Sequence, residues 1–200
     1  MTDPADTIAT NPTDDAPLTT SKRDDAVERQ IDALPEGKGD SIVARTVTIN
    51  RPTPELFAYW RDFANLATFM ENVVSIEQLD DKRSHWTVRA PAGRTVQWTA
   101  RVTQEAQDSF IAWASEDNAD VANSGRVDFK DAGARGTVVT ATIAYDPPGG
   151  IVGKVIAKLF QREPAIQARR DLRRFKQFME TGEIATSSMT KAHHAAHKAG

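Results

Sequence analysis

Hydrophobic and polar residues alternate along several short segments of this chain, the pattern of a half-buried β-strand. In residues 94–103, Val96, Trp98, Ala100 and Val102 point one way and the intervening polar residues point the other. Similar patterns predict strands at residues 41–49, 73–79, 84–90, 110–115, 125–130 and 137–145. Short turn sequences separate the last six of these seven strands, so we expect an antiparallel meander with one buried face.

Apolar residues spaced as in a helix follow the first predicted strand and the last one. Residues 53–60 and 62–70 are predicted to form two short helices, with Thr53 as the N-cap and Pro54 at the first helical position. Apolar positions spaced three or four apart predict one long helix over residues 151–181, kinked at Pro164. The predicted fold is α+β and of the helix-grip type: a seven-stranded antiparallel sheet wrapped around a long C-terminal helix, with two short helices after strand 1.

Composition divides the chain into three parts. Residues 1–39 form an acidic arm that we expect to be disordered, except for a short helix at 21–34 where Val27, Ile31 and Leu34 share a face. Residues 40–183 form the domain, and residues 184–200 form a flexible tail. Residues 1–40 carry a net charge of −6 and residues 154–180 a net charge of +5, so the two segments can attract each other. Apolar runs are too short to span a bilayer and no signal-peptide pattern is present, so we expect a cytoplasmic protein.

Few residues of this chain suggest catalysis. The absence of cysteine excludes disulfides, thiolate metal sites and cysteine nucleophiles. His85, expected on the outer face of its strand, is interpreted as structural, with a general acid/base role as the alternative. His193, His194 and His197 are interpreted as part of a floppy tail, with a metal shared by His193 and His197 of a helix as the alternative. Phosphate-loop and nucleophile-elbow motifs are missing. We therefore predict no catalytic residue, no metal site and no cofactor.

The basic residues near the C-terminus lack the interleaved aromatics of a nucleic-acid site, so no nucleic-acid partner is predicted. They are Arg169, Arg170, Arg173, Arg174 and Lys176. A solvated helix face is the plainer interpretation, and peripheral contact with a membrane surface is the alternative. The oligomeric state stays open.

Alternation places aromatic residues on the inner face of the sheet, notably Trp86, Trp98, Phe129 and Tyr145. Two interpretations stay open: a plain core, or the wall of a pocket for an apolar ligand. In the second, the Tyr145 hydroxyl would orient a ligand carbonyl. Phe110 and Trp113 fall on opposite faces of one strand, so only one of them can point inward.

Several short sequences resemble the START-like superfamily, also called SRPBCC. They are Phe57-Ala-Tyr-Trp-Arg-Asp62, His85-Trp86, Pro91-Ala-Gly93, Ile111-Ala-Trp113, Asn123-Ser-Gly125, Tyr145-Asp-Pro-Pro-Gly-Gly150, Asp171-Leu-Arg-Arg-Phe-Lys176 and Glu180-Thr-Gly-Glu183. The chain looks most similar to bacterial proteins of the polyketide cyclase/dehydrase or coenzyme Q-binding-protein-like branch. The resemblance implies a deep cavity between sheet and C-terminal helix, in which members bind lipids, sterols, polyketides, quinones or plant hormones.

The function predicted on this basis is binding or transport of a hydrophobic small molecule, lipid, quinone or polyketide-like. The predicted ligand-binding residues are Phe69, Trp86, Trp98, Phe129, Tyr145, Ile156 and Phe160. One alternative is an enzyme of the polyketide cyclase or dehydratase type, since some members catalyse cyclisation or dehydration. A second alternative is a protein-interaction module that uses the acidic arm and the basic helix.

Overall fold

The computed structural model of the chain describes residues 41–90, 93–145 and 164–185. Strand β1 (Ser41–Ile49) leads into helix α2 (Thr53–Arg61) and the 3-10 helix η1 (Phe63–Thr68). The next strands are β2 (Val73–Gln78), β3 (Arg83–Ala90), β4 (Arg94–Ala106), β5 (Phe110–Ser115) and β6 (Asn123–Asp131). The 3-10 turn η3 (Gly133–Arg135), β7 (Thr137–Tyr145) and helix α4 (Pro164–Thr181) complete the described elements.

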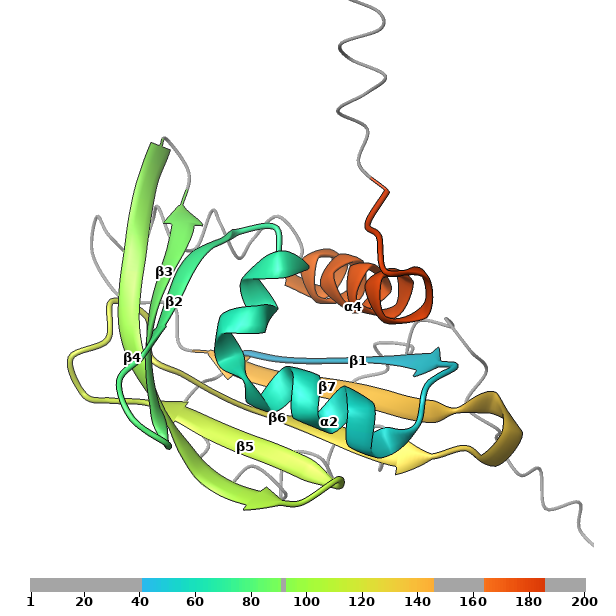
Figure 1. Ribbon diagram of the computed structural model, residues 1–200. Coiled ribbons are helices and arrows are strands. Elements are labelled where there is room, and N and C mark those ends of the chain that lie inside the picture. The colour runs from blue at the N-terminus through green and yellow to red at the C-terminus, as the bar shows by residue number, and fades with distance from the viewer. Residues whose placement is uncertain (1–40, 91–92, 146–163, 186–200) are drawn as a thin grey trace, which may run out of the picture.

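The seven strands form one curled antiparallel sheet in the order β1-β7-β6-β5-β4-β3-β2. Consecutive strands from β2 to β7 are neighbours, and β1 joins at the end beside β7. Helices α2 and α4 and the η1 segment lie on the concave face of the sheet (Figure 1). This arrangement confirms the predicted helix-grip fold.

Aromatic rings fill the space between the helices and the middle of the sheet. Phe175 of α4 is fully buried, and its ring centroid lies 4.8 Å from that of Phe69 and 5.1 Å from that of Trp60. Phe129 of β6 packs edge-on to Phe57 of α2 at 5.7 Å. Tilted and edge-to-face contacts of this kind are the favoured geometries of aromatic pairs. This part of the concave face is therefore a solid core.

Trp113 is the inward-pointing aromatic of β5, and a glycine makes room for it. A Cβ atom at Gly125 of β6 would overlap the indole ring of Trp113, so only glycine allows this close approach. Phe110 points to the convex face, where the Arg126 guanidinium lies 3.6 Å from its ring centroid. The structure thus decides which of the two aromatics points inward.

Two predictions for the helices after β1 are wrong: the N-cap of the first helix and the extent of the second. Thr53 does not cap α2: the N-cap residue is Pro52, and no side chain of the described residues caps the helix. The Thr53 hydroxyl instead shares a 3.0 Å hydrogen bond with the Thr137 hydroxyl of β7. The expected second helix, 62–70, is a shorter 3-10 helix. Of the predicted long helix, residues 164–181 are helical as α4, and residues 151–163 lie outside the described residues.

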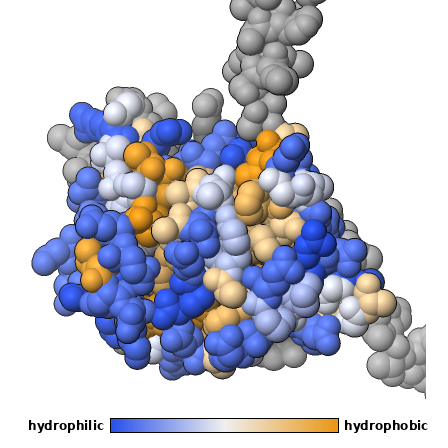
Figure 2. Space-filling view, viewed as in Figure 1, coloured by the Kyte–Doolittle hydropathy of each residue, from blue (hydrophilic) through white to orange (hydrophobic). Residues whose placement is uncertain are grey.

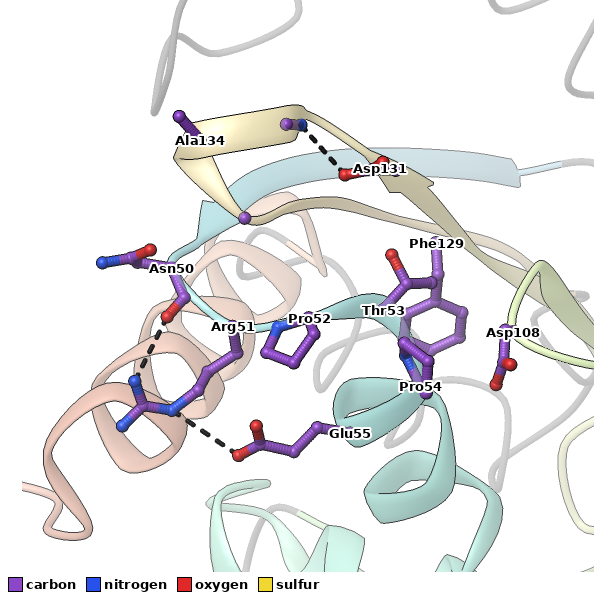
Figure 3. Close-up of a pocket in the computed structure, with 12 residues that line it drawn as sticks. Asn50, Arg51, Pro52, Thr53, Pro54, Glu55, Asp108, Phe129, Asp131 and Ala134 are labelled. Atoms are coloured by element: carbon purple, nitrogen blue, oxygen red, sulfur yellow. Dashed lines mark hydrogen bonds and ion pairs between the residues drawn. The ribbon is translucent and has the colours of Figure 1, made fainter.

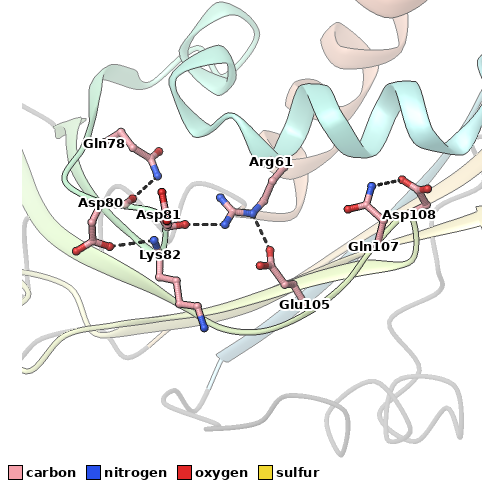
Figure 4. A network of polar contacts seen from close by, with 8 residues as sticks. All are labelled: Arg61, Gln78, Asp80, Asp81, Lys82, Glu105, Gln107 and Asp108. Carbon is pink, nitrogen blue, oxygen red and sulfur yellow. Dashed lines mark hydrogen bonds and ion pairs between the residues drawn. The ribbon is translucent and has the colours of Figure 1, made fainter.

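Polar contacts anchor helix ends to the turns of the sheet. The Arg61 side chain at the end of α2 donates to the Glu105 carboxylate of β4 and to the Asp81 carbonyl, both at 2.6 Å (Figure 4). In the same turn, the Asp80 carboxylate accepts from the backbone N–H of Lys82 at 2.9 Å. Because α2 is fixed at this end, the aromatic side chains that it contributes to the core keep their positions.

Candidate functional site

Two tryptophans stack on the concave face toward the β2 edge of the sheet. Trp86 of β3 and Trp98 of β4 are partners in the strand register, so both side chains leave the same face. Their rings are nearly parallel, with an interplanar angle of 10° and a centroid distance of 6.0 Å. The Trp86 indole N–H donates to the Ser84 hydroxyl at 2.9 Å, which fixes the orientation of the ring. Both tryptophans are half-buried.

This Trp86–Trp98 pair lies where two separate hydrophobic clusters meet. Trp86 packs against the main core described above. Trp98 packs against a smaller cluster formed by Val88, Ala90, Val96 and Val121. Between these clusters the apolar concave surface is only partly covered by described residues, since both tryptophan side chains stay partly exposed. An apolar surface of this kind, next to a packed core, suits an apolar ligand.

The other predicted ligand-binding residues lie in different surroundings. Phe69 and Phe129 are 1% and 5% exposed and belong to the solid core. Tyr145 ends β7 and is 8% exposed, in register with Asn123 of β6 and Ser41 of β1. Ile156 and Phe160 lie outside the described residues. The structure therefore brings together Trp86 and Trp98, and separately Phe69 and Phe129.

Sequence reasoning missed a polar cluster between α4 and the segment that joins η1 to β2. The Asp171 carboxylate accepts from the Gln167 side-chain amide at 2.9 Å and from the Glu71 backbone N–H at 3.3 Å. Burial raises the pKa of Asp171 to about 6, against the effect of these hydrogen bonds. The Glu71 carboxylate pairs with Arg170 at 3.3 Å. A half-buried carboxyl group whose pKa is near neutrality is a common feature of functional sites.

Positive charge from two elements meets between β1 and α4. Arg45 occupies a concave-face position of β1, since it shares its strand face with the core residue Val47 and alternates with Ala44 and Thr46. Burial lowers the pKa of Arg45, and the positive charge of Arg169 on α4 lowers it further. Positive charge is thus present along the wall where the helix meets the sheet.

An open pocket of about 760 Å³ lies just beyond the C-terminal end of β1, around the start of α2. Figure 3 shows the Phe129 ring beside Thr53 and Pro54, with Asp108 nearby, and Arg51 turned toward Glu55. The Arg51 guanidinium pairs with the Glu55 carboxylate at 3.5 Å. Among the predicted ligand-binding residues within the described ranges, Phe129 alone lines this pocket. Its rim carries both signs of charge, which gives no preference for one ligand class.

Metal binding and membrane crossing gain no support from the part of the chain that the structure describes. His85 lies on the convex face, as expected from alternation, with its Nδ1 3.3 Å from the Thr99 hydroxyl. Within residues 41–90, 93–145 and 164–185, no three His, Cys, Asp or Glu side chains gather as metal ligands would. Neither α2 nor the described part of α4 has the length and apolar character that crossing a membrane requires.

Apolar residues also reach the outer surface in separate groups. Figure 2 shows one group over β2 and the segment that leads into it, and another at the C-terminal end of α4, with hydrophilic side chains around them. Among the described residues, the large aliphatic side chains that are exposed are Val74 in β2 and Leu79 just after it, 47% and 46% exposed. Scattered exposure of this kind is ordinary for a folded domain. The Trp86–Trp98 pair thus remains the best candidate for a ligand surface.

Several proteins of known structure share this architecture. A Deinococcus radiodurans protein of known crystal structure is 42% identical, over 72% of this chain and 100% of that chain, with a TM-score of 0.58. A Thermus thermophilus protein is 22% identical over 66% of this chain and 92% of its own length, with a TM-score of 0.57. The Zhui aromatase/cyclase of a Streptomyces species is 16% identical over 72% of this chain and 99% of its own, with a TM-score of 0.56.

At such low identity the last two similarities establish the fold alone. Among curated proteins no match was found. The model of one protein family, described as polyketide cyclase/dehydrase and lipid transport, matches residues 41–180, which include all the described strands and nearly all of α4. The resemblance found in the sequence is therefore confirmed, and the chain belongs to the polyketide cyclase/dehydrase and lipid transport family.

Proposed function

We propose that this protein binds a hydrophobic small molecule, a lipid, quinone or polyketide-like compound, against the Trp86–Trp98 pair on the concave face. The observation that carries the proposal is the incomplete burial of two stacked tryptophans at the point where the main core meets the smaller cluster. The description of the family, which includes lipid transport, supports a ligand of this class.

Burial of apolar surface favours binding of such a ligand against the two tryptophans. Burial of apolar surface is favourable by about 25 cal/mol per Å², so a ligand that covers two indole faces gains several kcal/mol. Stacking of a flat ring or chain on an indole adds to this. Polar groups such as the Tyr145 hydroxyl would set the orientation of the bound molecule, and the remaining predicted residues, Ile156 and Phe160, would line the helix side.

A fluorescent apolar probe tests the proposal. N-phenyl-1-naphthylamine should bind the parent protein, and Trp98→Ala or Trp86→Ala should weaken its affinity by about tenfold or more, as expected for the loss of an aromatic stacking partner. Phe110→Ala, which removes a half-buried aromatic from the convex face of the same sheet, is the matched control and should bind normally. Equal affinities in all four proteins would disprove the proposed site.

The second candidate is an enzyme of the cyclase or dehydratase type, and Asp171 is the observation in its favour. A carboxyl group with a pKa of about 6 can donate or accept a proton near neutral pH. Turnover of a polyketide-like substrate that is lost in Asp171→Asn, with probe binding retained, would favour this candidate. A cytoplasmic location and contact of the α4 arginines with a membrane surface stay predictions.

A further inference from the structure

The convex face of the sheet carries a patch of small residues that is closed to solvent. Its members, called the convex patch below, are Ala112 and Ala114 of β5, Ser124 of β6, and Thr142 and Ala144 of β7, and each is between 0% and 2% exposed. The register places Ala114 beside Ser124 and Ser124 beside Ala144, so the patch is continuous across three strands.

These residues point away from the described helices. They alternate with Ile111, Val127 and Ala141, which belong to the main core on the concave face. Helices α2 and α4 and the η1 segment all cover that concave face (Figure 1). Gln104 and Arg126 flank Ala112 in the register, and Arg101 flanks Ala114, so long side chains shield part of the patch. Ser124 lies between Ala114 and Ala144, and side chains this short cannot shield one another. The burial of Ser124 and Ala144 therefore calls for a further layer over this part of the sheet.

Apart from residues 91–92, three stretches of the chain lie outside the described residues, and their points of attachment differ. Residues 186–200 follow the end of α4, where Glu180 contacts Asn50 and Arg51 just beyond β1. The convex patch lies toward the opposite end of β1, where Ser41 pairs with Tyr145. Residues 146–163 lead from Tyr145 to α4, which lies on the concave face. Residues 1–40 enter β1 at Ser41, at the edge of the patch.

We propose that residues 21–34 form a helix that lies on the convex patch and buries Val27, Ile31 and Leu34 against it. Fourteen helical residues extend about 21 Å, and the distance from β1 to β5, three strand spacings, is about 14 Å. Residues 35–40 can span up to about 20 Å, so the helix reaches the whole patch. Small side chains on a sheet allow a helix to approach closely and pack without voids.

Charge supports the same assignment. Arg101 lies on the convex face in register with Ala114, so positive charge borders the patch on the β4 side. Residues 1–40 carry a net charge of −6. Residues 21–34 themselves carry three basic and four acidic residues, a net charge of −1, so most of the attraction to this face would come from the rest of the arm. The hydrophobic stripe determines which side of the helix contacts the sheet.

The absence of cysteine from the chain allows a direct test by thiol labelling. In the full-length protein, a single cysteine introduced as Ala114→Cys should react slowly with a water-soluble disulfide reagent. Adding Ile31→Glu should accelerate the reaction by about tenfold or more, because a charge in the stripe detaches the helix. Ala33→Glu adds the same charge away from the stripe and should leave the rate unchanged. Thr95→Cys, on the exposed convex side of β4, should react fast in every background.

Three results would overturn the proposal. Ala114→Cys reacting as fast as Thr95→Cys would show that the patch is open. A rate that responds to Ile156→Glu and not to Ile31→Glu would assign the cover to residues 146–163. A rate that falls with increasing protein concentration would assign it to a second copy of the chain. Circular dichroism monitors folding of each variant, and Ser124→Cys replaces Ala114→Cys in the same design where the latter fails to fold.

Discussion

Burial and nearby hydrogen-bond donors shift the pKa of the Asp171 carboxyl group in opposite directions. Burial in the contact between α4 and the η1–β2 segment is the main effect and raises its pKa to about 6. Hydrogen bonds from Glu71 and Gln167 and the charge of Arg174 oppose that rise, while the Glu71 carboxylate adds to it. At neutral pH the folded protein therefore holds a carboxylate in surroundings that favour the protonated form.

Asp171→Asn should stabilise the protein at neutral pH. The pKa of Asp171 is higher in the folded chain than its ordinary value of 3.8, so protonation favours folding and this contribution is lost as the pH rises through about 6. We expect the variant to exceed the parent in free energy of unfolding by about 1 kcal/mol at pH 7.5, with the difference shrinking toward pH 4.

Urea unfolding of both proteins at several pH values measures this difference. Glu71→Gln is the control, because it removes a neighbouring negative charge and should lower the pKa of Asp171 in a ¹³C NMR titration. A parent protein more stable than Asp171→Asn at pH 7.5 would mean that attraction to Arg174 outweighs burial.

The sequence was enough to predict how residues close together in the chain are oriented. Contacts between residues that only the fold brings together could not be predicted. Alternation within β3 and β4 was enough to place Trp86 and Trp98 on one face, as the strand register confirms. The Asp171 carboxylate accepts a hydrogen bond from Glu71, which is distant in sequence, and no local sequence pattern predicts that contact. The hydroxyl of Thr53 could cap a helix by local rules, but Thr137, brought next to it by the β1–β7 pairing, takes the hydrogen bond.

Among the elements, α4 is held at its C-terminal end by the turn that follows β1. The Asn50 backbone N–H donates to the Glu180 carboxylate at 2.7 Å, and the Arg51 guanidinium donates to the Glu180 carbonyl at 3.0 Å. These contacts join the last described helix to the segment between the first strand and the first helix. The alternation of apolar and polar residues was enough to predict where the strands lie. The contacts of Glu180 could not be predicted in this way, because they depend on where α4 packs in the folded protein.

Glu180→Ala should loosen that junction without unfolding the domain. The variant loses the charge-assisted hydrogen bond to Asn50, and we expect the free energy of unfolding to fall by about 1 kcal/mol. Hydrogen exchange of the Asn50 amide should become faster, since its acceptor is gone. Glu183→Ala removes an exposed carboxylate just beyond α4 and should change neither quantity. Unaltered exchange at Asn50 in Glu180→Ala would contradict this account.

At the scale of the whole molecule, the concave face combines two hydrophobic clusters with different degrees of closure. The main cluster is sealed by α2, η1 and α4, and Phe175 at its centre is 0% exposed. The second cluster, beside Trp98, is formed mainly by the smaller side chains of β3 and β4. We infer that the first cluster stabilises the fold and that the second serves the ligand.

This division predicts opposite effects of two substitutions on stability and on binding. Phe175→Leu should lower the free energy of unfolding by about 1–2 kcal/mol, because a smaller side chain leaves a void in a sealed core. It should still be stabilised by added N-phenyl-1-naphthylamine, since a ligand that binds only the folded state stabilises it by mass action. Trp98→Ala should lose that stabilisation by the probe, whatever its own stability. Urea unfolding with and without the probe measures both quantities, and a Trp98→Ala variant that the probe stabilises as much as the parent would show that the second cluster is ordinary core.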